Sequence, residues 1–169
     1  MQKVSKIFQY LAVVCGAIWL GADLSRTMLT FYLFQGNKFE LKPFITNEFL
    51  QPIFYFVNPL ILITIIAYLA FLVSFLLFIS TSNIKLKQNG WLFITLILVI
   101  TLAPFELYLI KLDYKILMSV FYSAFDSKYI LSQTIERFKV LGSFPLIHLF
   151  SFLAIIYLLI FQPLKKNEN

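Results

Sequence analysis

The chain has 169 residues, of which 60% are hydrophobic, 18% aromatic and only 13% charged. Soluble domains carry about a quarter of charged residues, so this composition predicts an all-α integral membrane protein. The formal net charge of +6 is spread in short Lys pairs between apolar runs, which argues against a nucleic-acid-binding protein. The single cysteine, Cys15, excludes an intramolecular disulfide and a CxxC redox pair.

The first apolar run, about residues 7–34, is long enough to cross a bilayer and is interrupted by Asp23 and Arg26. These two residues are three positions apart, so on a helix they lie on one face and can pair. An unpaired charge at the bilayer centre costs roughly 2.5 to 3.5 kcal/mol on insertion scales. We therefore expect this face to point toward other helices. No small-x-small cleavage site follows the run, which predicts an uncleaved first span.

Three more apolar runs follow in chain order. A loop over residues 35–52 leads to the second run, about 53–80, in which Asn58 is a polar interruption. The third run, about 91–110, carries Glu106, and the fourth, about 140–163, carries His148. Together these runs predict a four-helix transmembrane bundle that forms one domain over residues 1–169.

The region between the third and fourth runs mixes charged residues with apolar positions at helical spacing. This pattern predicts one or two amphipathic surface helices. They either extend the third span out of the membrane or lie flat on its surface, and the sequence leaves both alternatives open.

The basic residues predict the orientation. In a four-span chain, the N-terminus, the loop at 81–90 and the C-terminus share one side, which holds Lys3, Lys6, Lys85, Lys87, Lys165 and Lys166 against the single acid Glu168. The positive-inside rule then predicts a multi-pass membrane protein with both termini cytoplasmic.

With this orientation, Asp23, Asn58, Glu106 and His148 all lie between about 20 and 24 Å from the cytoplasmic edge, at about 1.5 Å per residue. Together with Arg26 they form a polar layer in the outer third of the bilayer. Three interpretations remain open. The layer is an internal network that fixes helix registry, a ligand or active site that opens outward, or a set of residues at the level of the headgroups.

Specific chemistry is not indicated at this layer. His148 is the only histidine, which excludes a bis-His haem site within one copy, and no Glu-x-x-His spacing exists. No serine lies in a Gly-x-Ser-x-Gly motif, the sequence typical of a nucleophilic serine in hydrolases. We therefore predict no metal site and no catalytic residue. A bound lipid or quinone is compatible with the layer, and no other cofactor is expected.

Several short features together resemble small bacterial membrane families. They are Pro104-Phe105-Glu106, Glu136-Arg137-Phe138, His148 and Pro163, within residues 95–163. The nearest families are the anthrone-oxygenase-like and copper-resistance-D-like proteins. The resemblance implies a four-helix fold in a bacterial inner (cytoplasmic) membrane rather than a reaction. A single histidine is too few for the histidine-rich copper sites of the second family.

The sequence favours a non-enzymatic accessory or structural subunit of a larger membrane assembly. Its expected partners are membrane lipids and either another membrane protein or a second copy of the chain, and no nucleic acid. The alternative is a small membrane enzyme or transporter that acts on a lipid-soluble ligand at the polar layer. In that case Asp23 or Glu106 would accept a proton and Arg26 would orient an anionic group.

Overall fold

The computed structural model describes residues 2–36, 39–82, 84, 86–121, 125–142 and 145–164. This part of the chain contains the helices α1 (Gln2–Phe31), α2 (Asn47–Thr81), α3 (Gly90–Phe121), α4 (Ser127–Leu141) and α5 (Pro145–Phe161). Two short strands, β1 (Phe34–Gln35) and β2 (Glu40–Leu41), and a 3-10 turn, η1 (Leu86–Gln88), complete the described elements. The predicted all-α class is confirmed.

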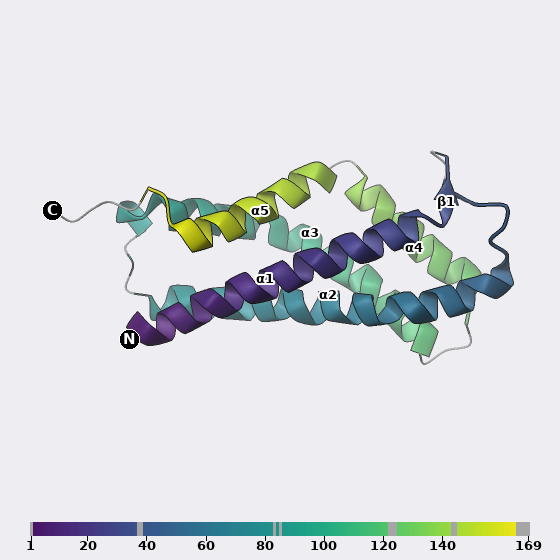
Figure 1. Cartoon of the computed structure of the whole chain (residues 1–169), viewed down its shortest axis with the longest axis horizontal. Helices are drawn as coiled ribbons and strands as arrows, with labels where there is room; N and C mark the ends of the chain where they lie inside the picture. Colours follow the sequence, from purple (N-terminus) through teal and green to yellow (C-terminus); the bar gives the residue numbers. More distant parts are fainter. Residues whose placement is uncertain are drawn as a thin grey trace.

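The long helices α1, α2 and α3 run lengthwise in alternating directions, and α4 and α5 occupy the remaining side of the bundle (Figure 1). α1 packs along α2, while α5 contacts both α1 and α3. α1 begins and α5 ends at the same end of the molecule, opposite the end that carries β1 (Figure 1).

The strands form a small antiparallel hairpin in which Phe34 pairs with Leu41. Gly36 supplies the turn with a φ of +64°, a left-handed conformation that glycine adopts without steric penalty. The amide of Lys42 then donates to the carbonyl oxygen of Leu33 at 3.0 Å and fixes the return of the chain. This hairpin closes one end of the bundle between α1 and α2.

Among the described residues, three helices are long and apolar enough to cross a membrane: Lys3–Phe31 within α1, the whole of α2, and the whole of α3. They correspond to the first three predicted spans. α1 ends at Phe31, three residues before the predicted limit, whereas α2 begins at Asn47, six residues before its predicted start.

The predicted fourth range, 140–163, is not one continuous helix. It includes the end of α4, and then α5 begins at Pro145. Proline favours the first turn of a helix because its missing N–H would be unpaired there. α5 has 17 residues and spans about 26 Å, slightly less than a hydrocarbon core of about 30 Å.

The region between the third and fourth spans divides into two parts. α3 continues to Phe121, eleven residues beyond the predicted end at 110, because Ile116, Leu117 and Val120 extend its buried face. The first part therefore extends the third helix, which is one of the two alternatives that the sequence left open. The second part is α4, which starts at the N-cap Asp126, whose side chain accepts hydrogen bonds from the amides of Lys128 and Tyr129.

Two apolar cores fill the bundle, and they lie at different levels along it. One is built from α1, α2, α3 and α5 around Trp19, Phe71 and Trp91. The other lies toward the hairpin and includes Phe54, Ile116 and Phe138. In chain order, the buried charges Asp23 and Arg26 fall between Trp19 of the first core and Leu33 of the second. A polar layer thus separates two well-packed apolar regions.

Candidate functional site

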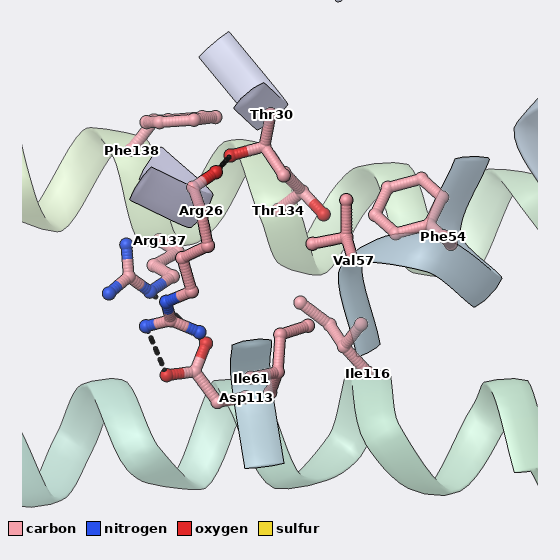
Figure 2. Close-up of a pocket in the computed structure, with 10 residues that line it drawn as sticks. All are labelled: Arg26, Thr30, Phe54, Val57, Ile61, Asp113, Ile116, Thr134, Arg137 and Phe138. Carbon is pink, nitrogen blue, oxygen red and sulfur yellow. Dashed lines mark hydrogen bonds and ion pairs between the residues drawn. The ribbon is translucent and has the colours of Figure 1, made fainter. Parts of the chain in front are cut away.

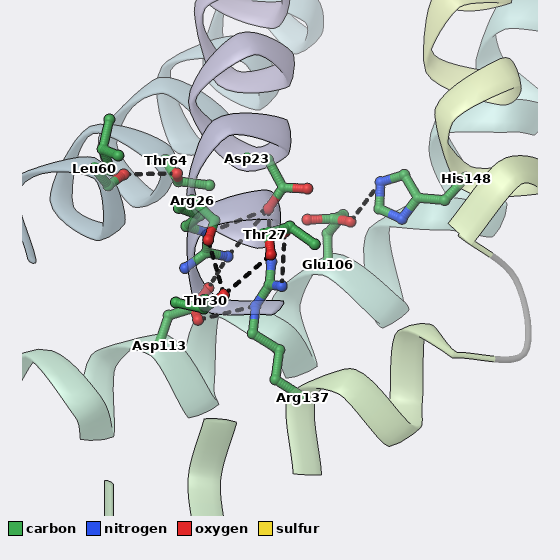
Figure 3. Close-up of polar contacts among 10 residues, drawn as sticks. All are labelled: Asp23, Arg26, Thr27, Thr30, Leu60, Thr64, Glu106, Asp113, Arg137 and His148. Atoms are coloured by element: carbon green, nitrogen blue, oxygen red, sulfur yellow. Dashed lines mark hydrogen bonds and ion pairs between the residues drawn. The ribbon is translucent and has the colours of Figure 1, made fainter. Parts of the chain in front are cut away.

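Four charged side chains form a closed ring in the polar layer. Arg26 Nη2 lies 3.1 Å from Asp23 Oδ1 and 2.6 Å from Asp113 Oδ2. Arg137 Nη2 lies 2.6 Å from the same Asp23 Oδ1, and Arg137 Nε lies 3.1 Å from Asp113 Oδ1. Each arginine therefore contacts both aspartates, and α1, α3 and α4 are joined through one alternating set of charges (Figure 3). We call these four residues the charge ring.

The charge ring is buried and electrically neutral. The four side chains are at most 12% exposed, and that of Asp113 is 1% exposed. Taking charges out of water is expensive, and the penalty is offset only when every charge meets an opposite one at close range. The planar guanidinium suits this arrangement because its fork contacts two carboxylates at once.

Hydroxyl groups and a small cavity complete the surroundings of the ring. Arg137 Nη1 donates to Thr27 Oγ1 at 3.4 Å, and Thr30 Oγ1 donates to the carbonyl oxygen of Arg26 at 2.8 Å. A cavity of about 20 Å³ adjoins Arg26, Asp113 and Arg137 (Figure 2). That volume holds about one water molecule, so the space beside the ring is too small for an organic ligand.

A buried pair of polar side chains lies two turns of α3 before Asp113. His148 Nε2 on α5 is 2.8 Å from Glu106 Oε1 on α3, and the Glu106 side chain is 3% exposed. The imidazole stacks on Trp19 of α1, with ring centres 5.4 Å apart and planes inclined by 14°. The Glu106–His148 pair therefore connects α3 to α5 and is held in place from α1.

A larger cavity adjoins the Glu106–His148 pair. Its volume is about 200 Å³, and its lining comes from α3, α4 and α5: Thr101, Leu102, Phe105, Leu109, Val140, Ile147 and His148. Only Thr101 and His148 in this lining carry polar side chains. The cavity is thus an apolar space with an imidazole in its wall.

The five residues predicted from the sequence occupy three different environments. Asp23 and Arg26 pair, as their spacing on one helix face predicts, and they belong to the charge ring. Glu106 and His148 contact each other outside that ring. Asn58 is fully buried, and neither atom of its amide has a hydrogen-bond partner among the described residues.

Sequence reasoning missed two members of the ring, Asp113 and Arg137, because it placed residues 111–139 outside the membrane-spanning runs, either as an extension of the third span or as helices flat on the membrane surface. A signal was present in the composition. The chain contains only two arginines among its fourteen basic residues, Arg26 and Arg137, and both are in the ring. Asp113 also follows Glu106 by seven residues, which places both on one face of a helix.

No metal centre is indicated in the part of the chain that the structure describes, where no three His, Cys, Asp or Glu side chains are grouped to hold an ion. The arrangement supports two kinds of role, a neutral ionic clamp at the charge ring and a polar wall for an apolar cavity at His148. Comparison with known proteins finds no family model, curated protein or solved structure that matches the chain.

Proposed function

We propose that the protein is an accessory or structural subunit of a larger membrane assembly, and that the outer faces of its helical bundle bind the partner. The charge ring carries this proposal. Its two arginines and two aspartates are paired with one another, so the ring has no net charge left over for a substrate. Such a ring holds three helices in one registry, which is what a docking surface made of helix faces requires.

The outer faces of the helices support a location in the membrane. Large apolar side chains such as Met28, Phe56, Ile100 and Phe150 are each more than 60% exposed. Soluble proteins rarely expose apolar surface on every helix, whereas lipid or partner helices cover it in a bilayer. These faces are available for lipids and for a partner subunit.

The proposal includes four crossings of a bacterial inner membrane with both termini cytoplasmic. α5 makes the fourth crossing, with the end of α4 contributing to its length. Lys3 and Lys6 lie in the first turns of α1, at the end of the bundle where α5 also ends (Figure 1). Lys85, Lys165 and Lys166, on which the orientation also depends, lie outside the described residues. The resemblance to four-helix families supports the same number of crossings.

Purification in a mild detergent tests the accessory role. We expect the protein to elute with a stoichiometric partner or as a homo-oligomer, with the mass determined by light scattering. A protein that elutes as a lone monomer at every detergent concentration contradicts the proposal.

A second candidate function is binding of a lipid-soluble ligand, as in a small membrane enzyme or transporter. The cavity beside His148 specifically favours it, because a buried pair of ionisable side chains at an apolar cavity offers a polar contact to an apolar molecule. Glu106→Gln keeps the shape of the side chain and removes its charge. Loss of ligand binding with an intact bundle favours this second function, whereas loss of the folded protein favours a purely structural pair.

A further inference from the structure

The cavity beside His148 is reached from the side of the bundle. Phe105 of α3 and Ile147 of α5 contribute to its lining and are 57% and 59% exposed. Leu109, which also lines it, is only 2% exposed. The cavity therefore runs from the outer face of the bundle, where lipid tails would lie, to the buried interior.

The polar group at this cavity is held rigidly. His148 contacts Glu106 on one side and stacks on the fully buried Trp19 on another. An imidazole in that setting offers a ligand one directed hydrogen bond inside an otherwise apolar space. An acyl chain cannot form this hydrogen bond, whereas a molecule with a carbonyl or hydroxyl oxygen on an apolar body can.

The size of the cavity limits the part of the ligand that enters it. A dry cavity of about 150 Å³ binds benzene, and pockets for drug-sized molecules start at about 300 Å³. The cavity of about 200 Å³ therefore suits a single substituted ring. A longer ligand would leave its tail outside, between the exposed side chains of Phe105 and Ile147.

We propose that this cavity binds the ring of a lipid-soluble quinone or quinol, with a ring oxygen hydrogen-bonded to His148 and the tail extending into lipid. Glu106 is a positioning residue, because it fixes the imidazole. The inference deepens the second candidate function, the ligand site, and is independent of the accessory role.

Tryptophan fluorescence gives a local test, because the chain has only two tryptophans. Trp19 stacks on His148, whereas Trp91 stacks on Phe78 near the start of α3, fifteen residues or about 22 Å of helix rise from Glu106. Trp91→Phe leaves Trp19 as the only reporter, and Trp19→Phe leaves Trp91 as a remote control. Each variant is reconstituted in lipid nanodiscs and titrated with a short-tail benzoquinone.

We expect saturable quenching of Trp19 and only a weak, linear decrease for Trp91. In the Trp91→Phe background, Thr101→Phe fills the cavity and should weaken binding by at least about tenfold. This factor corresponds to the loss of about 1.4 kcal/mol of binding free energy. Ile100→Phe adds the same ring next to it on an exposed side chain that does not line the cavity, and should leave binding unchanged. His148→Gln should weaken binding about fivefold by loss of the directed hydrogen bond.

Four outcomes overturn the inference. Equal quenching of both tryptophans indicates simple partition of the quinone into lipid. Equal binding by the Thr101→Phe and Ile100→Phe variants places the quinone elsewhere. Saturable quenching of Trp19 by a brominated fatty acid, with none by the quinone, keeps a ligand site but assigns it to acyl chains. If neither probe quenches Trp19 saturably, the second candidate function fails as well.

Discussion

At the scale of single residues, the central feature is that four charges are buried as a set and not as separate pairs. Asp23 Oδ1 meets both arginines, and Asp113 meets them with one oxygen each. Removal of one member leaves an uncompensated charge in the interior, whereas removal of an oppositely charged pair leaves a neutral remainder. The ring should therefore respond to mutation in a strongly non-additive way.

Asp113→Asn should lower the free energy of unfolding by about 3 kcal/mol, because it leaves two arginines facing one aspartate. Arg137→Gln should have a similar effect with the opposite excess charge. The double variant retains only the Asp23–Arg26 pair and should be more stable than the sum of the single effects predicts, by about 1 to 3 kcal/mol. Unfolding of the detergent-solubilised protein in SDS, followed by circular dichroism, measures all three.

The control for these charge changes is Glu40→Gln, because Glu40 is an exposed acid on β2 outside the ring. Its effect should be within about 0.5 kcal/mol. Single and double ring variants with strictly additive effects would show that the four residues do not act as a set.

Asn58 presents the opposite case, a buried polar group without compensation. Its amide is 0% exposed and unpaired among the described residues, and a buried amide without a hydrogen bond costs about 1 to 3 kcal/mol in proteins. Asn58→Leu keeps the branched shape and should raise the free energy of unfolding by about 1 kcal/mol.

Thr64→Val is the matched control for Asn58→Leu on the same helix. Thr64 is also buried, but its hydroxyl donates to the carbonyl oxygen of Leu60 at 2.7 Å, so this variant should gain nothing (Figure 3). The same SDS titration compares the two. A larger loss from Asn58→Leu than from Thr64→Val would mean that the amide has a polar partner.

At the scale of helices, α1 packs against both α2 and α5, and a small residue allows its close approach. A Cβ atom at Gly16 would lie 3.4 Å from Phe71 Cδ2 and 3.6 Å from Phe152 Cε1. α1 thus packs against aromatic rings of both α2 and α5 at this level. Gly21, one and a half turns later, has no atom within 4 Å of the corresponding position.

Gly16→Leu should lower the free energy of unfolding by about 2 kcal/mol, because three further carbon atoms cannot fit against Phe71 and Phe152 without separating the helices. Gly21→Leu makes the same change on the same helix in open space. It should stabilise the protein by up to about 1 kcal/mol through helix propensity. Thermal unfolding followed by circular dichroism compares them, and equal melting temperatures would contradict the packing argument.

At the scale of the whole molecule, the alternation of helix direction sets which segments lie on the same side of a membrane. The β1–β2 hairpin and the start of α4 lie at one end of the bundle, and the start of α1 lies at the other (Figure 1). A bilayer across the apolar faces would therefore separate Lys6 from both Glu40 and Lys128.

Cysteine labelling checks this arrangement. In a Cys15→Ser background, Glu40→Cys and Lys128→Cys should react with a membrane-impermeant maleimide in intact bacterial cells. Lys6→Cys should react only after the inner membrane is permeabilised. All three positions are exposed, so differences in labelling report sidedness rather than burial. Labelling of Lys6→Cys alone in intact cells would reverse the orientation, and labelling of Glu40→Cys without Lys128→Cys would change the number of crossings.

The amino-acid sequence by itself determined the all-α class, three long apolar helices and the pairing of Asp23 with Arg26. These properties are local, because they depend on composition over about twenty residues or on a spacing of three. The predicted positions of helix ends were less accurate. α3, for example, continues beyond its strongly apolar part because its later residues also make buried apolar contacts.

Only the tertiary structure decided that Asp113 and Arg137 close the charge ring and that α4 packs into the bundle. It also decided that Asn58 contacts neither the charge ring nor the Glu106–His148 pair through hydrogen bonds. Arg26 and Asp113 are 87 positions apart in the chain, and Asp23 and Arg137 are 114 apart. Contacts at such separations depend on how the helices pack against one another. The repeat along a single helix shows that a residue faces inward, but the partner it meets there depends on the rotation and register of its neighbours.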